Sequence, residues 1–345
     1  MKKLLLTAAL ICGFSASAMA ETYKIAWSHY TGWEPWGYIE DSGIMDKWAE
    51  KYGIDVEIVK VNDYIESINL YTAGEFQGVT ATNMDALTIP AVGGVDTSAI
   101  IIGDYSNGND AIVAQGVDAV AGLKGKDIKL VELSVSHYLL ARALEVNGLS
   151  EKDLTVINTS DADIGGLFMS DDKANVVTWN PIVNEIKAKE GAQILFDSSQ
   201  TPGEILDLLV VRTDADEKLK KALVGAWYEA MGHMSNHDDL AHADMMEFVA
   251  DQAGGTLDQY KEQLTTTEMF YTPSDAIAYA TPEKLFETMD YVRTFSFDKG
   301  LYGEGMESPD ALGIELPNKT VLGSDQNVKF RFDHTYMQMA ADGKL

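Results

Sequence analysis

The chain has 345 residues, of which 54 are Asp or Glu and 26 are Lys or Arg, so its formal net charge is −28 at pH 7. This acidic balance argues against nucleic acid and anionic membrane surfaces as partners, because both would repel the protein. The length exceeds that of one ordinary domain, so we expect two lobes.

The N-terminal residues have the three parts of a secretory signal. Lysines at positions 2 and 3 precede an apolar run over 4–14, and a small-residue cleavage site follows at 18–20. We therefore expect residues 1–20 to be a signal peptide and the mature chain to begin at Glu21. The one cysteine, Cys12, would leave with the signal. Export without disulfides points to a bacterial periplasm and to stability from the core.

Strands and helices alternate along the chain. We expect strands at 23–28, 55–61, 78–82, 98–102, 111–113, 128–133, 154–158, 174–179, 193–196 and 205–212, with a helix over 35–52 and others after most strands. This alternation indicates βαβ units and a largely parallel sheet. From residue 214 the pattern is helical, at 217–235, 238–253, 257–263 and 282–295. The last residues, about thirty of them, show no such pattern, and we expect them to wrap irregularly over the surface.

Two segments could carry the chain between lobes, near Asp104–Asp110 and Leu206–Arg212. Because no flexible linker separates the lobes, this arrangement is that of a hinged clamshell. We expect residues 21–108 and 207–345 to form the first lobe with the C-terminal helices, and residues 109–206 to form the second.

An aromatic stretch, Ile25–Tyr38, contains three of the six tryptophans. There a short strand runs into a loop just before a helix begins at a proline. Its rings could form a flat wall for a small ligand, or they could pack the first helix onto the sheet. The four candidate rings are Trp27, Tyr30, Trp33 and Trp36.

Polar residues gather where the predicted strands end, which is where ligands bind in parallel α/β sheets. Several of them would also serve as helix N-caps, and of the two acids at the start of one helix Asp163 suits capping better and Asp161 is the freer carboxylate. The candidates are Asn83, Asp85, Asp110, Ser134, Ser136, His137, Asp161, Trp179 and Glu204.

The sign of their charge favours a cation. An anion site would add Arg, Lys, Ser and Gly to the helix N-termini, but no Lys or Arg stands among these residues. Carboxylates beside Trp and Tyr faces suit a small planar cation, through charge-assisted hydrogen bonds and cation–π contact. A neutral urea-like amide could use the same groups less fully.

Enzyme and metal motifs are weak in this sequence. His237 and His242 are five residues apart, which does not align them on one helical face. Ser134 and His137 lack the Gly-x-Ser-x-Gly context of a hydrolase, and no Gly-x-Gly-x-x-Gly follows a strand. We expect no catalytic residue, no cofactor and no metal.

Four segments resemble one group of proteins: Asn62–Asn69, Thr82–Pro90, Glu132–Arg142 and Asn158–Asp163. They look like the periplasmic binding proteins of ABC importers found with urea carboxylase genes. That subgroup is similar to the wider nitrate/sulfonate/taurine and thiamine-pyrimidine binding proteins. The resemblance implies the type II periplasmic-binding-protein fold, with two α/β lobes, a hinge and an interlobe ligand cleft. It also implies a non-catalytic receptor that delivers its ligand to an ABC permease in the inner membrane, and we expect a monomer.

The resemblance also bears on the ligand. In the wider family the helix at the Ser134–His137 position commonly helps to hold an anionic head group, but Glu132 and Val135 depart from that pattern here. The carboxylase pathway also handles guanidine, so guanidinium or a urea-like relative is the expected ligand. An aminopyrimidine, a sulfonate such as taurine, and a secreted hydrolase remain the alternatives.

Overall fold

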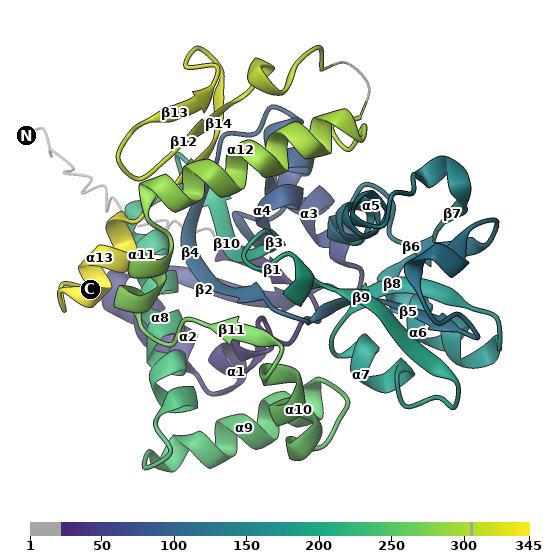
Figure 1. Ribbon diagram of the computed structural model, residues 1–345. Coiled ribbons are helices and arrows are strands. Elements are labelled where there is room, and N and C mark those ends of the chain that lie inside the picture. Colours follow the sequence, from purple (N-terminus) through teal and green to yellow (C-terminus); the bar gives the residue numbers. More distant parts are fainter. Residues whose placement is uncertain (1–21, 304–305) are drawn as a thin grey trace, which may run out of the picture.

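The computed structural model of the protein describes residues 22–303 and 306–345. The predicted signal peptide, residues 1–20, lies outside the described residues. Two sheets, one of nine strands and one of five, form the centres of two lobes that lie side by side (Figure 1).

The larger sheet has the order β13-β12-β14-β4-β10-β3-β1-β2, and β11 pairs with β4. The β1–β2 and β1–β3 pairs are parallel, as the βαβ pattern predicts, whereas β10 runs antiparallel to both β3 and β4. Its strands are β1 (Thr22–Trp27), β2 (Asp55–Lys60), β3 (Gly78–Thr82), β4 (Thr97–Ser106), β10 (Leu206–Arg212), β11 (Thr267–Met269), β12 (Gly313–Glu315), β13 (Val321–Gly323) and β14 (Val328–Phe332).

The smaller sheet has the order β7-β6-β8-β5-β9. Strand β5 is antiparallel to its neighbours β8 and β9, so this sheet too is mixed rather than largely parallel. Its strands are β5 (Asp110–Gln115), β6 (Asp127–Leu130), β7 (Thr155–Asn158), β8 (Asn175–Trp179) and β9 (Ala192–Asp197). The chain passes from the larger sheet to the smaller between β4 and β5, and it returns between β9 and β10.

Helices cover both sheets (Figure 1). They are α1 (Pro35–Asp41), α2 (Ile44–Tyr52), α3 (Tyr64–Ala73), α4 (Asn83–Ala86), α5 (Val135–Val146), α6 (Asp161–Ser170), α7 (Ile182–Ile186), α8 (Glu217–Ser235), α9 (Leu240–Gln252), α10 (Leu257–Leu264), α11 (Pro273–Tyr279), α12 (Pro282–Asp298) and α13 (Thr335–Ala341). The single helix expected over 35–52 is wrong. It is broken between α1 and α2, where Gly43 takes a φ of 75° that other residues rarely adopt.

The expectation of an irregular C-terminal segment is also wrong. Strand β14 lies beside β4, and helix α13 follows it. Phe330 and Phe332 are buried, whereas Lys329 before them and Arg331 between them are partly exposed, which is the alternation of a half-buried strand. Because this strand is short, its period-2 pattern is a weak signal in the sequence.

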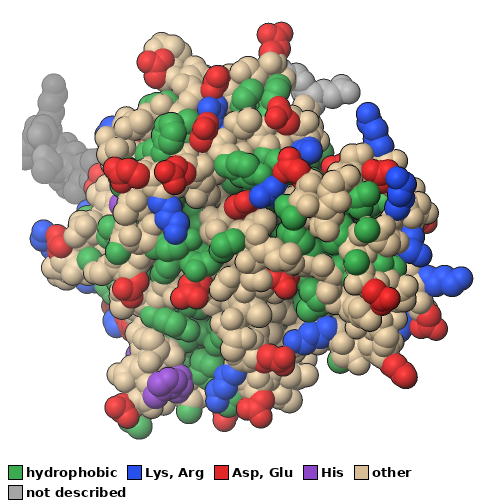
Figure 2. Space-filling view, in the orientation of Figure 1, with side chains coloured by type: hydrophobic (Ala, Val, Ile, Leu, Met, Phe, Trp, Pro, Cys, Tyr) green, Lys and Arg blue, Asp and Glu red, His purple; other side chains and the backbone are tan. Residues whose placement is uncertain are grey.

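Acidic and basic side chains are interspersed across the face seen in Figure 2. Within residues 22–303 and 306–345, no helix combines the length and the apolar character needed to cross a bilayer.

Candidate functional site

A small, tightly packed cavity lies between the two sheets, and its volume is about 10 Å³, which is room for the centre of about one water molecule. Asp207 reaches it from β10 of the larger sheet, whereas Asp110 and Trp179 reach it from β5 and β8 of the smaller sheet. A ligand held there would touch both lobes. The lining residues are Tyr30, Trp33, Tyr64, Thr82, Asp110, Val135, Trp179 and Asp207.

Four aromatic rings form a continuous chain around this cavity. The ring centroids of Tyr30 and Trp33 are 4.9 Å apart, those of Trp33 and Tyr64 are 5.5 Å apart, and those of Tyr64 and Trp179 are 5.5 Å apart. The Trp179 indole N–H donates to the backbone carbonyl of His29 at 2.9 Å, which fixes that ring across the two lobes. Rings held in this way present rigid π faces to a ligand.

Asp85 lies at the start of α4, beside the cavity, and is 1% exposed. Its Oδ2 atom accepts hydrogen bonds from Tyr64 Oη at 2.7 Å, from Thr82 Oγ1 at 3.0 Å and from the Val135 backbone N–H at 3.2 Å. All three donors belong to residues that line the cavity. Burial raises the pKa of Asp85 to about 6, although these hydrogen bonds oppose the shift.

Asp104 and Asp207 face each other as cross-strand partners on β4 and β10. Both are almost completely buried, and the Tyr30 hydroxyl donates to Asp104 Oδ1 at 2.7 Å. The Oδ2 atom of each is buried and accepts no hydrogen bond from the described residues. The backbone at Gly32 lies close to Asp104, and only glycine fits there, since a Cβ at this position would lie 2.3 Å from Asp104 Oδ2.

Asp110 supplies a carboxylate from the smaller sheet. The Ser106 hydroxyl donates to its Oδ2 atom at 2.6 Å. Burial raises the pKa of Asp110 to about 7, and the nearby charge of Asp85 adds to the shift. Throughout the described chain, no Lys, Arg or His forms an ion pair with Asp85, Asp104, Asp110 or Asp207. We call these four residues the carboxylate cluster.

The structure thus brings five of the sequence candidates to the cavity or beside it: Tyr30, Trp33, Asp85, Asp110 and Trp179. Two aromatic candidates lie elsewhere. Trp36 is buried against Trp227 with ring centroids 5.1 Å apart, and Trp27 is buried in a T-shaped contact with His29, with ring centroids 5.8 Å apart. Both pack the core, because α1 and β1 turn these rings away from the cavity.

Three other candidates hold local structure, and Ser136 lies among them. Ser134 caps α5, and the Ser136 hydroxyl is buried in the first turn of that helix with no hydrogen-bond partner among the described residues. The His137 ring accepts from the Leu133 backbone N–H at 3.1 Å. The Asn83 side chain donates to the Glu204 carbonyl and accepts from the Leu206 N–H, both at 3.0 Å, and so holds the returning chain against α4.

The last two acidic candidates lie outside the cavity. Glu204 forms a bidentate ion pair with Arg142 of α5, with both hydrogen bonds at 3.0 Å, so the charge of Glu204 is already neutralised by the guanidinium. Asp161 accepts from the Tyr64 backbone N–H at 3.2 Å and lines a wider hollow beside the cavity, with His29 and Gln252. Its hydrogen bond with Tyr64 joins the two lobes, and Asp161 is not among the residues that line the cavity.

Sequence reasoning missed five residues at or beside the cavity: Tyr64, Thr82, Asp104, Val135 and Asp207. A signal did exist for the two acids. Asp104 follows the apolar run of β4, and Asp207 interrupts the apolar run of β10. A charge inside a buried strand is costly and usually has a function.

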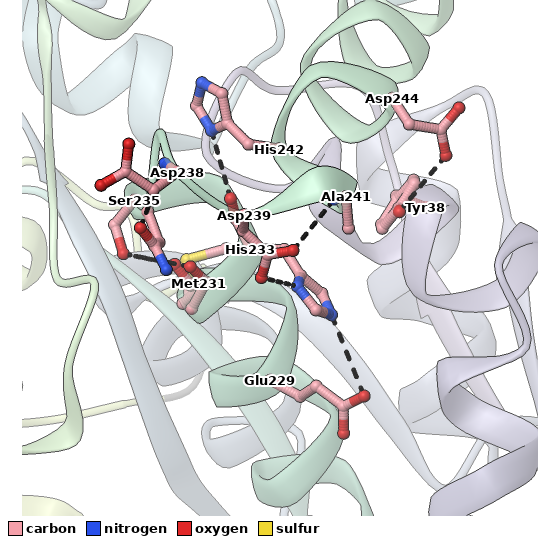
Figure 3. A network of polar contacts seen from close by, with 12 residues as sticks. Tyr38, Glu229, Met231, His233, Ser235, Asp238, Asp239, Ala241, His242 and Asp244 are labelled. Carbon is pink, nitrogen blue, oxygen red and sulfur yellow. Dashed lines mark hydrogen bonds and ion pairs between the residues drawn. The ribbon is translucent and has the colours of Figure 1, made fainter.

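The histidine-rich corner of α8 and α9 forms a structural network (Figure 3). His233 Nδ1 lies 2.7 Å from Asp239 Oδ2, and Asp239 also accepts from the Ala241 N–H to cap α9. The His242 ring lies 3.2 Å from the His233 carbonyl. The residues that the structure describes include no group of three or more possible metal ligands.

Comparison with known proteins adds the family. The model described as NMT1/THI5 like matches residues 47–239, which is more than half of the chain. The taurine-binding periplasmic protein of Escherichia coli is 25% identical over 175 residues, covering 50% of this chain and 54% of that protein. The chain therefore spans about half the length of this curated relative.

Solved structures share the fold at low sequence identity. The alkanesulfonate-binding protein SsuA from Xanthomonas axonopodis pv. citri, bound to MOPS, has a TM-score of 0.67 and 14% identity, covering 82% of this chain and 94% of its own. The periplasmic nitrate-binding protein NrtA from Synechocystis has a TM-score of 0.65 and 12% identity, covering 94% and 89%. These likenesses confirm the predicted two-lobed periplasmic-binding-protein fold. Because the family model matches more than half of its length, the chain belongs to the NMT1/THI5-like family.

Proposed function

We propose that this protein is the periplasmic solute receptor of an ABC importer and that it closes on a small organic cation, best represented by guanidinium. The observation that carries the proposal is the carboxylate cluster, which is buried among aromatic rings with no basic side chain paired to it among the described residues. Buried carboxylates without partners are costly, so the cluster needs a cation to complete it.

Guanidinium matches both parts of the site. It is planar and presents several N–H donors around its edge, which suits carboxylate oxygens on several sides. Its faces can lie against the rings of Trp33, Tyr64 and Trp179 through cation–π contact. The tight packing of the lining side chains around this small cavity favours a ligand of few heavy atoms over an aminopyrimidine with its substituents.

The receptor would work by closure of its two lobes. Asp207 lies on the larger sheet and Asp110 on the smaller, so a ligand bound to both draws the lobes together. Contacts outside the cavity then hold them, including Asp63 with Ser160 at 2.7 Å and Trp179 with His29 at 2.9 Å. We assign residues 21–108 with 207–345 to one lobe and 109–206 to the other, which the composition of the two sheets supports.

The periplasmic location, the absence of catalytic activity and the permease partner are inferred from the family. Family membership and the named relatives support a periplasmic receptor without catalytic activity, delivering its ligand to an inner-membrane permease. We include in the proposal the removal of residues 1–20, a monomeric state and membership of the urea carboxylase-associated subgroup.

Taurine or another sulfonate is the second candidate, because the relatives named above include taurine- and sulfonate-binding proteins. A sulfonate would bring a negative charge to four carboxylates, which is unfavourable. Isothermal titration calorimetry with guanidinium, urea and taurine separates the candidates. We expect guanidinium to bind most tightly, and tight taurine binding without a guanidinium response would overturn the cation assignment.

A further inference from the structure

The pair Asp104 and Asp207 is more than a source of negative charge. The register of β4 and β10 sets the two residues opposite each other, and neither Oδ2 atom has a hydrogen-bond donor among the described residues. Like charges directly opposite each other in a sheet are destabilising. Two carboxyl groups in such a site keep one proton between them, as a hydrogen bond from one acid to the other carboxylate.

We propose, resting on the proposed function, that the receptor exchanges this shared proton for its cation, and that the exchange selects an organic cation over a neutral amide of the same shape. In the unliganded receptor the Asp207 carboxyl donates its proton to Asp104. When the cation enters, the proton leaves to solvent and the ligand N–H groups take its place. One positive charge enters and one leaves, so the net charge of the cavity is unchanged.

The sheet geometry explains why Asp104 and Asp207 share one proton between them, whereas Asp85 and Asp110 titrate singly. Asp104 and Asp207 are on neighbouring strands of one sheet, so backbone pairing keeps them together whether the lobes are open or closed. Asp110 belongs to the smaller sheet, and Asp85 receives its third hydrogen bond from Val135 across the lobes. The surroundings of those two acids therefore change with closure.

The groups around the pair agree with this assignment. Burial raises the pKa of both acids, and the charge of Asp104 raises that of Asp207 further. When the Asp207 carboxyl carries a proton, its hydrogen bond to Asp104 raises the pKa of Asp207 and lowers that of Asp104. The titratable groups that act on the pair from the surrounding elements are Tyr30, Asp110, Tyr260 and Tyr271, none of them a cation at any pH.

The exchange predicts different pH profiles of affinity for two ligands of one shape. Guanidinium competes with a proton, so its affinity should rise about tenfold per pH unit until the pair loses its proton unaided. Urea carries no charge and does not displace the proton, so its weaker affinity should not rise with pH. The pair would thus act as the element that discriminates charge, while the rings and the cavity size select shape.

The test is calorimetry of the full mature chain with guanidinium in two buffers that differ in ionisation enthalpy, at about pH 5.5 and about pH 8. The heats give the number of protons released, and we expect about one per ligand at the higher pH, where Asp85 and Asp110 have already lost their own protons. Asp207→Asn should still bind guanidinium, more weakly, with almost no proton release and a flatter pH profile. Asp104→Asn provides a second variant of the same pair, and melting temperature confirms that each is folded.

Asp110→Asn is the matched control, because it removes one cavity carboxylate and leaves the pair intact. It should weaken binding but keep the proton release. Guanidinium binding without proton release in the wild type, or release lost in Asp110→Asn and kept in Asp207→Asn, would overturn this inference and leave the proposed function standing. Absence of guanidinium binding at every pH would overturn the proposed function and this inference together.

Discussion

The Oδ2 atom of Asp85 accepts a hydrogen bond from the backbone N–H of Val135, 3.2 Å away. Asp85 lies on α4, which follows β3 of the larger sheet, and Val135 is the first residue of α5 in the smaller lobe. A carboxylate beside the cavity therefore joins the two lobes directly. A bound cation that changes the charge of Asp85 would also change this contact between the lobes.

Replacing Asp85 should weaken ligand binding strongly. Asp85→Asn removes a negative charge from the cavity and weakens the acceptor for the Val135 N–H, so the Kd for guanidinium should rise by about 10- to 100-fold. Asp163→Asn, an exposed acid in the first turn of α6, removes the same charge from the surface and is the control. Calorimetric Kd values that are equal for the two variants would show that Asp85 does not contribute to guanidinium binding.

Two tryptophans of the aromatic stretch should respond in opposite ways. Trp33→Ala removes a cavity wall, so it should weaken guanidinium binding by about 100-fold or more, far more than it affects folding. Trp36→Ala removes a ring stacked on Trp227 in the core, so it should lower the free energy of unfolding by about 3–5 kcal/mol. Chemical denaturation and calorimetry of both variants test this, and a larger binding loss in Trp36→Ala, measured on folded protein, would contradict the assignment.

The unliganded protein should lose stability as the pH rises from acid to neutral. Burial raises the pKa of Asp85 to about 6 and that of Asp110 to about 7, so the folded form holds protons that the unfolded chain has already lost. Between about pH 4 and about pH 7 each such carboxyl should lower the free energy of unfolding, by up to about 1.4 kcal/mol per pH unit.

Thermal unfolding at a series of pH values measures this loss without urea, which is itself a candidate ligand of the cavity. Asp110→Asn should flatten the slope, whereas Asp118→Asn, which changes an exposed acid near the end of β5, should leave it unchanged. Guanidinium hydrochloride at millimolar concentration should restore stability at neutral pH if the cation occupies the cluster. A slope of opposite sign would show that the buried acids are ionised at little cost.

Glu204 should influence closure rather than ligand charge. Its pair with Arg142 lies beside Tyr291, whose ring centroid is 4.8 Å from the Arg142 guanidinium carbon, and so ties α5 to α12. Glu204→Gln should weaken guanidinium and urea binding by the same factor, less than about tenfold, because a closure contact acts on both ligands equally. Asp110→Asn should weaken guanidinium selectively, and a charge-selective effect of Glu204→Gln in titrations of both ligands would contradict this role.

The alternation of strands and helices predicted most of the fold, because each βαβ unit has a strong local pattern. Helix α8 falls at the predicted residues, 217–235. The pattern could not reveal that β10 and β5 run antiparallel to their neighbours in the two sheets. The direction of pairing depends on which strands meet in space, and the local sequence does not contain that information. The break at Gly43 and the short strand β14 were missed because their local signals are weak beside long helices.

The candidate site was predictable where a strand end supplies the residue. Trp33, Asp85, Asp110 and Trp179 follow that rule and lie at or beside the cavity. Glu204 and Asp161 follow it too, yet their carboxylates are used by Arg142 and by the Tyr64 backbone, partners that only the tertiary structure reveals. Asp207 lies inside a strand, so a search of strand ends passes over it.

The central claim is that a cavity of carboxylates and rings receives a small organic cation. Calorimetric titration of the mature chain at neutral pH with guanidinium, urea and taurine tests it most directly. We expect tight guanidinium binding, weaker urea binding and no response to taurine. Tight binding of taurine with no heat from guanidinium would contradict it.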